Sequence, residues 1–188
     1  MAFPAGYVEL LEKLSVAFTA YKDRTGHPPL LVGGAATAIM TTGSFMSGDF
    51  DIIAPDDDAF VSAMEENGFI GEDRVGYMPK GFYHPEHPEY GFEQVSGQPF
   101  EGRSDWRRLV HQVMRGGHAL VLPSFEDMIA DRLAQHALAS PTDDSRLRQA
   151  RMILMMAKDI DVHYLERRVA EEDGDVNLLD LDALRRKE

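Results

Sequence analysis

The chain has 188 residues, 44% of them hydrophobic, which is enough apolar material for one large domain or for one domain with a helical appendage. It contains no cysteine, which excludes a disulfide framework and a thiolate zinc site. The formal net charge of −13 at pH 7 argues against a general nucleic-acid binder, because affinity for phosphate backbones comes mostly from lysine and arginine. No apolar run reaches the roughly 18 residues of a membrane span, so the sequence predicts a cytoplasmic protein without membrane contact.

The first part of the sequence alternates helical and strand-like segments. Apolar residues at helical spacing, closed by Gly26, predict an amphipathic first helix. The proline at residue 55 and the acidic residues after it are typical of a helix start. The expected elements, in chain order, are a helix over 7–25, a strand over 28–32, a helix over 35–43, a strand over 49–54 and a helix over 55–67.

The later part of the sequence changes from strands to helices. The expected strands cover 75–78, 90–95, 109–114 and 118–122, the last two joined as a hairpin, and helical patterns follow over 124–139, 143–159 and 161–173. The predicted fold class is α/β (α+β), a mixed sheet flanked by helices and followed by a C-terminal helical segment. The expected organisation is an α/β domain over 1–122, a helical segment over 123–172 packed on it, and a flexible tail over 173–188.

Two aspartates stand on the strand predicted at 49–54. Side chains two apart on a strand point to the same face, so Asp49 and Asp51 project together while Phe50 and Ile52 pack on the other side. Neighbouring carboxylates repel and raise each other's pKa unless a cation lies between them. The pair therefore predicts a divalent metal site, and Mg²⁺ suits carboxylate oxygens and substrate phosphates. The alternative is an exposed pair of aspartates at a strand entry.

A glycine pair precedes these aspartates. Gly33 and Gly34 end the strand at 28–32, and the helix predicted over 35–43 follows directly. Bare backbone amides and the positive end of a helix then meet where a phosphate group can bind. The alternative is that the glycines end the strand for steric reasons alone.

The combination resembles the polymerase-beta-type nucleotidyltransferase superfamily. That family's pattern is an apolar residue, Gly-Gly or Gly-Ser, a short helix, and Asp-apolar-Asp on the next strand; here it is Val32-Gly33-Gly34 and Asp49-Phe50-Asp51. The sequence looks most like small bacterial nucleotidyltransferase-like proteins, some of them related to nucleotidyltransferase toxins of toxin–antitoxin systems. The resemblance covers roughly residues 5–170, and the glycines and aspartates are its specific part.

The resemblance implies a function and a metal. It implies transfer of a nucleoside monophosphate from an NTP to a hydroxyl acceptor, which is a small molecule, a protein or an RNA. Asp49 and Asp51 would hold Mg²⁺ or Mn²⁺, with Glu93 as a third ligand or as the base for the hydroxyl proton. Glu89 and Glu101 compete with Glu93 for this role; Glu93 is preferred because it lies inside an apolar run, where an unpaired carboxylate is costly.

Further residues are candidates for nucleotide binding. The amides at Gly33 and Gly34 would bind phosphate oxygens, and the Ser47 hydroxyl would add a donor. Arg132 would offset charge on the leaving pyrophosphate, with a surface salt bridge inside its own helix as the alternative.

Two other readings of the sequence remain open. Many relatives carry an arginine a few residues before the first aspartate, where this chain has Phe45, which favours a catalytically weak or inactive binding module with a protein partner. The second of these readings is a structural or oligomeric domain that binds no ligand. His84 and His87, with two neighbouring glutamates, are also candidate ligands for zinc, and the alternative is an irregular loop formed by the neighbouring prolines.

Overall fold

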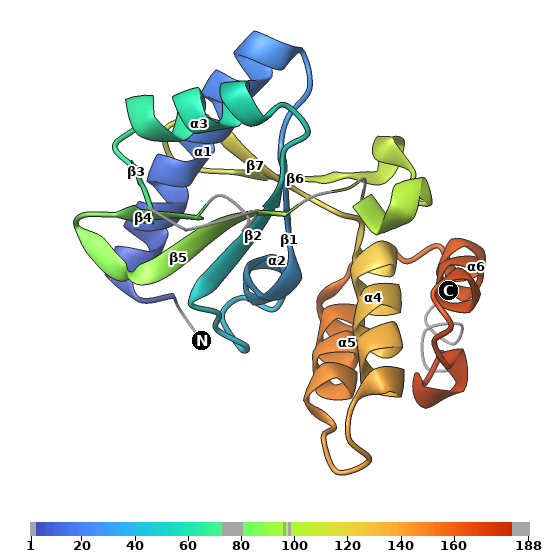
Figure 1. The fold of residues 1–188 in the computed structure, drawn as a ribbon. Coiled ribbons are helices and arrows are strands. Elements are labelled where there is room, and N and C mark those ends of the chain that lie inside the picture. The colour runs from blue at the N-terminus through green and yellow to red at the C-terminus, as the bar shows by residue number, and fades with distance from the viewer. Residues whose placement is uncertain (1–2, 73–80, 96, 98, 182–188) are drawn as a thin grey trace. The chain divides into compact units, whose positions relative to one another are not determined.

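The computed structural model describes residues 3–72, 81–95, 97 and 99–181 (Figure 1). The chain forms two compact units, which meet in sequence between Pro123 and Ser124. The strand predicted over 75–78 lies outside the described residues. Within the described part, no helix has both the length and the apolar composition that crossing a membrane requires.

The first unit contains the mixed α/β arrangement predicted from the sequence. Its elements are α1 (Ala5–Thr25), β1 (Leu30–Val32), α2 (Gly33–Met40), β2 (Asp49–Ile53), α3 (Asp57–Glu66), β3 (Ile70–Gly71), β4 (Gly81–His84), β5 (His87–Val95), η1 (Pro99–Gly102), η2 (Trp106–Arg108), β6 (Val110–Val113) and β7 (Ala119–Leu122). Local signals set several boundaries. α1 ends at Gly26, which adopts a left-handed φ of 81°, and Asp56 caps α3 by accepting a hydrogen bond from the Ala59 amide at 2.9 Å.

Five strands form one sheet in the order β1-β2-β5-β4-β3. β2 runs antiparallel to β1 and parallel to β5, whereas β4 runs antiparallel to both β5 and β3. The sheet is therefore mixed, as predicted. β6 and β7 form a separate antiparallel pair, which is the predicted hairpin.

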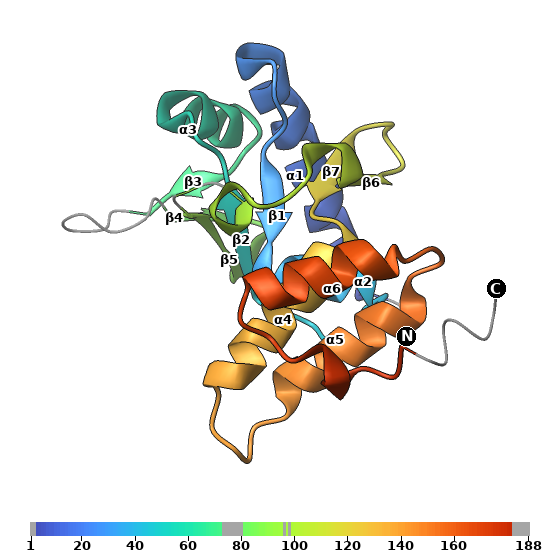
Figure 2. The same cartoon turned by 90° about the vertical axis from the view of Figure 1, so that its right-hand side faces the viewer.

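Helices α1 and α3 lie side by side over one face of this sheet (Figures 1 and 2). Phe50, Ile52, Phe82 and Phe92 point into this layer and are at most 2% exposed. Burial of such side chains contributes about 1.5–3 kcal/mol each. The alternation along β2 then sends Asp49 and Asp51 to the opposite face.

The opposite face divides into an apolar end and an acidic end. Leu30, Ile53 and Val121 form a small buried cluster at the apolar end. The registers Leu30 with Ile53 and Val32 with Asp51 place the aspartates nearer the start of β2 than Ile53, which belongs to this cluster. The acidic end is thus fixed by the strand register.

Sequence reasoning missed β3 and β4 and was wrong about the segment around the histidines. The prolines beside His84 and His87 predict an irregular loop, but Pro85 and Glu86 form the turn of the β4–β5 hairpin. Pro88 lies on β5 before the stretch that pairs with β2, which begins at Gly91. A missing N–H costs no hydrogen bond to β2 at that position.

The second unit consists of α4 (Phe125–Leu138), α5 (Ser145–Met156), α6 (Val162–Glu171) and η3 (Val176–Leu178), with α4 in contact with both α5 and α6. Residues 173–181 were expected to belong to a flexible tail, but they include η3 and bury Leu179 and Leu181. Whether the unit packs on the sheet stays a prediction.

A buried ion pair joins α4 to α6. Arg168, which is 0% exposed, donates from Nε to Asp127 at 2.6 Å and from its other nitrogens to Glu171 and Glu172. Burial alone lowers the pKa of the guanidinium, but the hydrogen bonds with these three carboxylates outweigh it and raise the pKa above its ordinary value. Sequence reasoning did not identify this pair, because the two residues lie 41 positions apart.

Candidate active site

The acidic end of the sheet is formed by β2 and β5. Asp51 pairs in register with Val32 on one side and with Glu93 on the other, and Asp49 pairs with Gly91. Because β2 and β5 are parallel and in register, the three carboxylates belong to the same face of the sheet. Asp49 is exposed, and Asp51 and Glu93 are half-buried.

Glycine is required where Asp51 meets the start of α2. Gly33 has a φ of +66°, and a Cβ built there would lie 2.1 Å from Asp51 Oδ2. Both the left-handed backbone and this close approach exclude a side chain. The Asp51 carboxylate therefore lies directly against the backbone at the N-terminus of α2.

The first turn of α2 has no side-chain cap. Its N-cap residue, Val32, makes no side-chain hydrogen bond to the helix, because valine has no polar group. A helix N-terminus carries a partial positive charge and amides directed outward, which together favour phosphate oxygens. The α2 terminus therefore brings backbone donors and the Asp51 carboxylate to one place.

Ser47 supports this turn locally. Its hydroxyl donates to the Asp49 carbonyl at 3.0 Å and accepts from the Asp49 amide at 3.3 Å. A Cβ on Gly34 would lie 2.6 Å from Ser47 Oγ, so the loop before β2 packs on the backbone of α2. The hydroxyl predicted to bind nucleotide is thus engaged with the neighbouring backbone.

Glu93, Glu89 and Glu101 were the candidates for the third carboxylate, and they occupy different positions in the structure. Glu93 lies on β5 beside Asp51, whereas Glu89 is exposed nearer the start of the strand. Glu101 lies in η1, is exposed and forms an ion pair with Arg103, which follows η1. Glu93 is therefore the one of the three that lies in register with the aspartates.

The three carboxylates are not gathered around a common point. In the part of the chain that the structure describes, the one group of three metal-ligating side chains with ligand atoms within 4.8 Å of one another is Glu9, Glu86 and His87. Mg²⁺ needs only one or two protein carboxylates beside substrate phosphates and water. A site on Asp49 and Asp51 is compatible with this geometry, and the role of Glu93 stays a prediction.

Arg132 belongs to the second unit and forms the ion pair inside its own helix that was the alternative to a nucleotide contact, with Asp131 of α4. The pair is not at the surface on the arginine side, because Arg132 is only 3% exposed. Its Nε donates to Asp131 at 2.9 Å and its Nη1 to Gln149 at 3.4 Å. These contacts hold the guanidinium between α4 and α5. A contribution of Arg132 to nucleotide binding stays a prediction.

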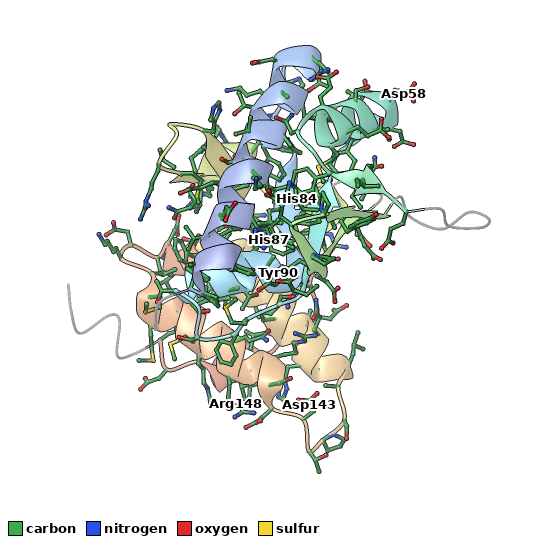
Figure 3. The ribbon with its side chains drawn as sticks, turned by 90° about the vertical axis from the view of Figure 1, so that its left-hand side faces the viewer. Asp58, His84, His87, Tyr90, Asp143 and Arg148 are labelled. Atoms are coloured by element: carbon green, nitrogen blue, oxygen red, sulfur yellow. The ribbon has the colours of Figure 1, made fainter. Side chains whose placement is uncertain are left out.

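The three potential metal ligands that do lie close together, Glu9, Glu86 and His87, are at the β4–β5 turn beside α1. Figure 3 shows His84, His87 and Tyr90 there. Glu9 comes from α1, which the sequence analysis did not connect with the histidines. No local sequence signal links them, because Glu9 and His87 lie on segments distant in sequence.

Comparison with solved structures shows which fold this mixed α/β arrangement belongs to. ANT(2'')-Ia in complex with adenylyl-2''-tobramycin is 14% identical, with a TM-score of 0.57, covering 90% of this chain and 98% of that chain. The solution structure of ANT(2'')-Ia, an antibiotic-resistance factor, is also 14% identical, with a TM-score of 0.57 and coverage of 89% and 91%.

An antigenic nucleotidyltransferase-like protein from Paracoccidioides brasiliensis is 15% identical, with a TM-score of 0.58, covering 84% of this chain and 85% of that chain. No protein-family model and no curated protein matches the sequence. The chain therefore has the nucleotidyltransferase fold, as its resemblance to that superfamily implied.

Proposed function

We propose that the protein transfers a nucleoside monophosphate from an NTP to a hydroxyl group of a small-molecule acceptor. The observation that carries this proposal is the contact of Asp51 with the backbone of Gly33, because it joins a carboxylate to a helix N-terminus suited to phosphate. The neighbour bound to adenylyl-2''-tobramycin favours a small molecule over a protein or RNA acceptor.

The residues at this place fit a divalent metal. Asp49 and Asp51 share one face, and their oxygens are the ligand type that Mg²⁺ and Mn²⁺ prefer. We assign these two aspartates as the residues that hold it. When bound, the ion supplies neutralisation of phosphate charge and orientation of the triphosphate.

The remaining chemistry falls to the chain itself. The acceptor oxygen attacks the α-phosphorus, the bond from that phosphorus to the pyrophosphate oxygen breaks, and the hydroxyl proton passes to a carboxylate. We assign Glu93 as this base because it lies on β5 in register with Asp51. The amides at Gly33 and Gly34 bind phosphate oxygens. Arg132 has no part in the proposal, because its guanidinium is bonded within the second unit.

A labelling experiment tests the function. Incubation with each α-labelled NTP, Mg²⁺ and a panel of hydroxylated small molecules, or a cell extract, is expected to label an acceptor and release pyrophosphate. Asp51→Asn should lower the rate by roughly 10²-fold or more, the scale on which loss of one charge-stabilising group reduces turnover. Asp58→Asn is the matched control, because this exposed aspartate lies in the first turn of α3.

Calorimetry with Mg²⁺ and a non-hydrolysable NTP separates binding from turnover. Binding that is lost in folded Asp49→Asn and Asp51→Asn variants supports the metal assignment. Binding without transfer to any acceptor would instead establish the non-catalytic module favoured by Phe45. Equal metal binding in the parent and both variants would remove the assignment.

A further inference from the structure

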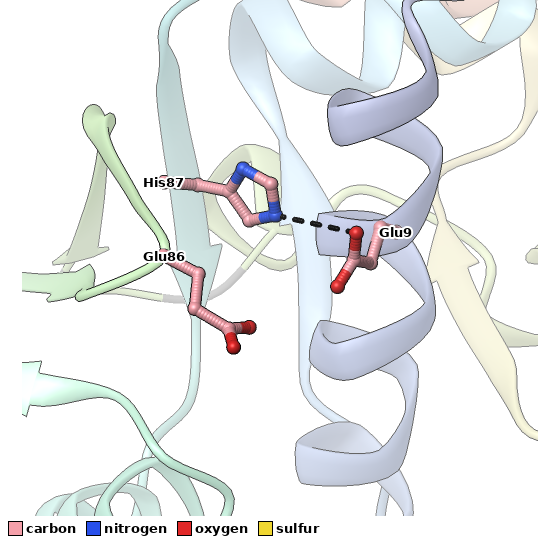
Figure 4. Close-up of side chains that lie close together, drawn as sticks. All are labelled: Glu9, Glu86 and His87. Atoms are coloured by element: carbon pink, nitrogen blue, oxygen red, sulfur yellow. Dashed lines mark ion pairs between the residues drawn. The ribbon is translucent and has the colours of Figure 1, made fainter.

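A second group of potential metal ligands lies where α1 meets the turn of the β4–β5 hairpin (Figure 4). Glu86 belongs to the turn, His87 begins β5, and Glu9 comes from α1. One oxygen or nitrogen of each residue lies within 4.8 Å of the others. The ligands therefore come from two segments of the fold that are distant in sequence.

The histidine is held with its Nε2 atom toward the carboxylate. His87 Nε2 lies 3.7 Å from Glu9 Oε2, is shielded from solvent and has no hydrogen-bond partner. A Cβ at Gly6 would lie 3.2 Å from His87 Cε1, so the ring packs on the backbone of α1. A buried polar atom without a hydrogen bond is costly, and coordination of a metal would satisfy it.

Lys13 offsets the charge of the two glutamates in the metal-free protein. Its ammonium lies 2.9 Å from Glu86 and 3.7 Å from Glu9, one turn along α1 from Glu9. The hydrogen bond from Lys13 is the main cause of a pKa of Glu86 below its ordinary value. The ammonium interacts with both carboxylates but does not satisfy His87.

We propose that Glu9, Glu86 and His87 bind a divalent transition metal of the Zn²⁺ type, which displaces Lys13 from the two carboxylates. Nitrogen and oxygen ligands at about 2.0–2.2 Å from Zn²⁺ lie roughly 3.4 Å apart in a tetrahedral site. The separations here need only small movements of the two glutamate side chains, both of which are more than half exposed. Three protein ligands leave the fourth position for water.

His84 supports the turn and is not a ligand in this proposal. Its Nδ1 accepts a hydrogen bond from the Glu86 amide at 3.3 Å, and its ring packs edge-on against Phe69. Metal-ligand residues often depend on such neighbours for their orientation. A ligand set of one imidazole and two carboxylates suits Zn²⁺ better than Mg²⁺, which prefers oxygen alone.

The proposed site is distinct from the aspartates of β2, whose side chains point to the face of the sheet opposite α1. Zinc binding is therefore measured in an Asp49→Asn/Asp51→Asn background, in which the proposed Mg²⁺ ligands are absent. The full chain is titrated with Zn²⁺ against a chromophoric chelator. Co²⁺ is added separately, because its visible absorption reports coordination number.

We expect one Zn²⁺ per chain and four-coordinate Co²⁺ absorption. His87→Gln and Glu9→Gln should each weaken Zn²⁺ by more than the roughly 10–100-fold that loss of an outer-sphere partner costs. Lys13→Met should tighten Zn²⁺ binding, because it removes the competing cation. His111→Gln, an exposed histidine on β6, is the matched control and should leave the affinity unchanged.

Circular dichroism confirms that each variant is folded before titration. The Lys13→Met arm keeps the test decisive if His87→Gln does not fold, because it leaves all three ligands in place. No stoichiometric Zn²⁺ binding would overturn the proposal. Equal affinity in the parent background and Glu9→Gln, or a Lys13→Met variant that binds no more tightly, would also overturn it.

Discussion

Replacement of Gly33 by alanine tests whether Asp51 is packed against the start of α2. Two costs add in this variant. A φ of +66° disfavours an L-residue by about 1–2 kcal/mol. The new Cβ would also lie 2.1 Å from Asp51 Oδ2, and relieving such overpacking costs typically 1–3 kcal/mol. We expect Gly33→Ala to lower the free energy of unfolding by about 2–5 kcal/mol in urea denaturation.

Two comparisons isolate the contact from the backbone strain. Gly26 has a φ of +81°, and no atom lies within 4 Å of a Cβ built there. Gly26→Ala should therefore lower the free energy of unfolding only by the backbone strain, about 1–2 kcal/mol. In an Asp51→Ala background the clash with the carboxylate is absent. Gly33→Ala should then lower the free energy of unfolding only by the backbone strain. Equal costs of Gly33→Ala in the parent and Asp51→Ala backgrounds would refute the reasoning.

Two further predictions concern the second unit. Arg168→Met should lower the free energy of unfolding by about 3–5 kcal/mol in urea denaturation, because it leaves Asp127 buried without its cation. A decrease of less than about 1 kcal/mol would show that the carboxylate finds another partner. Hydrogen bonding to Arg168 lowers the pKa of Glu171 from its ordinary 4.5, so the stability it contributes is present above that pH and lost as pH falls through the lower folded value. The difference in unfolding free energy between the parent and Glu171→Gln should therefore shrink below about pH 4.5, and a difference independent of pH would contradict this.

Local patterns were sufficient for much of the first unit. Phe50 and Ile52 alternate with Asp49 and Asp51, and this period of two places the aspartates on the face opposite α1 and α3. The glycine pair predicted the end of a strand followed directly by a helix, although α2 begins at Gly33 itself. These features depend on residues close together in sequence.

Features set by long-range pairing were not accessible from the sequence. The register that sets Glu93 beside Asp51 depends on β5 joining β2 in parallel, after a hairpin that the prolines had suggested was a loop. The approach of Glu9 to His87 likewise depends on how α1 crosses the sheet. Periodicity reports which face a side chain occupies, but it does not report which segment lies opposite.

Burial determines which cation each group of carboxylates takes. Asp127 is almost fully buried, and its permanent partner is the equally buried Arg168, because a buried charge without a partner is strongly destabilising. Glu86 is mostly exposed, so its ion pair with Lys13 contributes little and an external cation can replace it. Asp49 is exposed in the same way, with its carboxylate beside Gly91 of β5. At such exposed positions an external cation can replace the internal partner of a carboxylate at little cost.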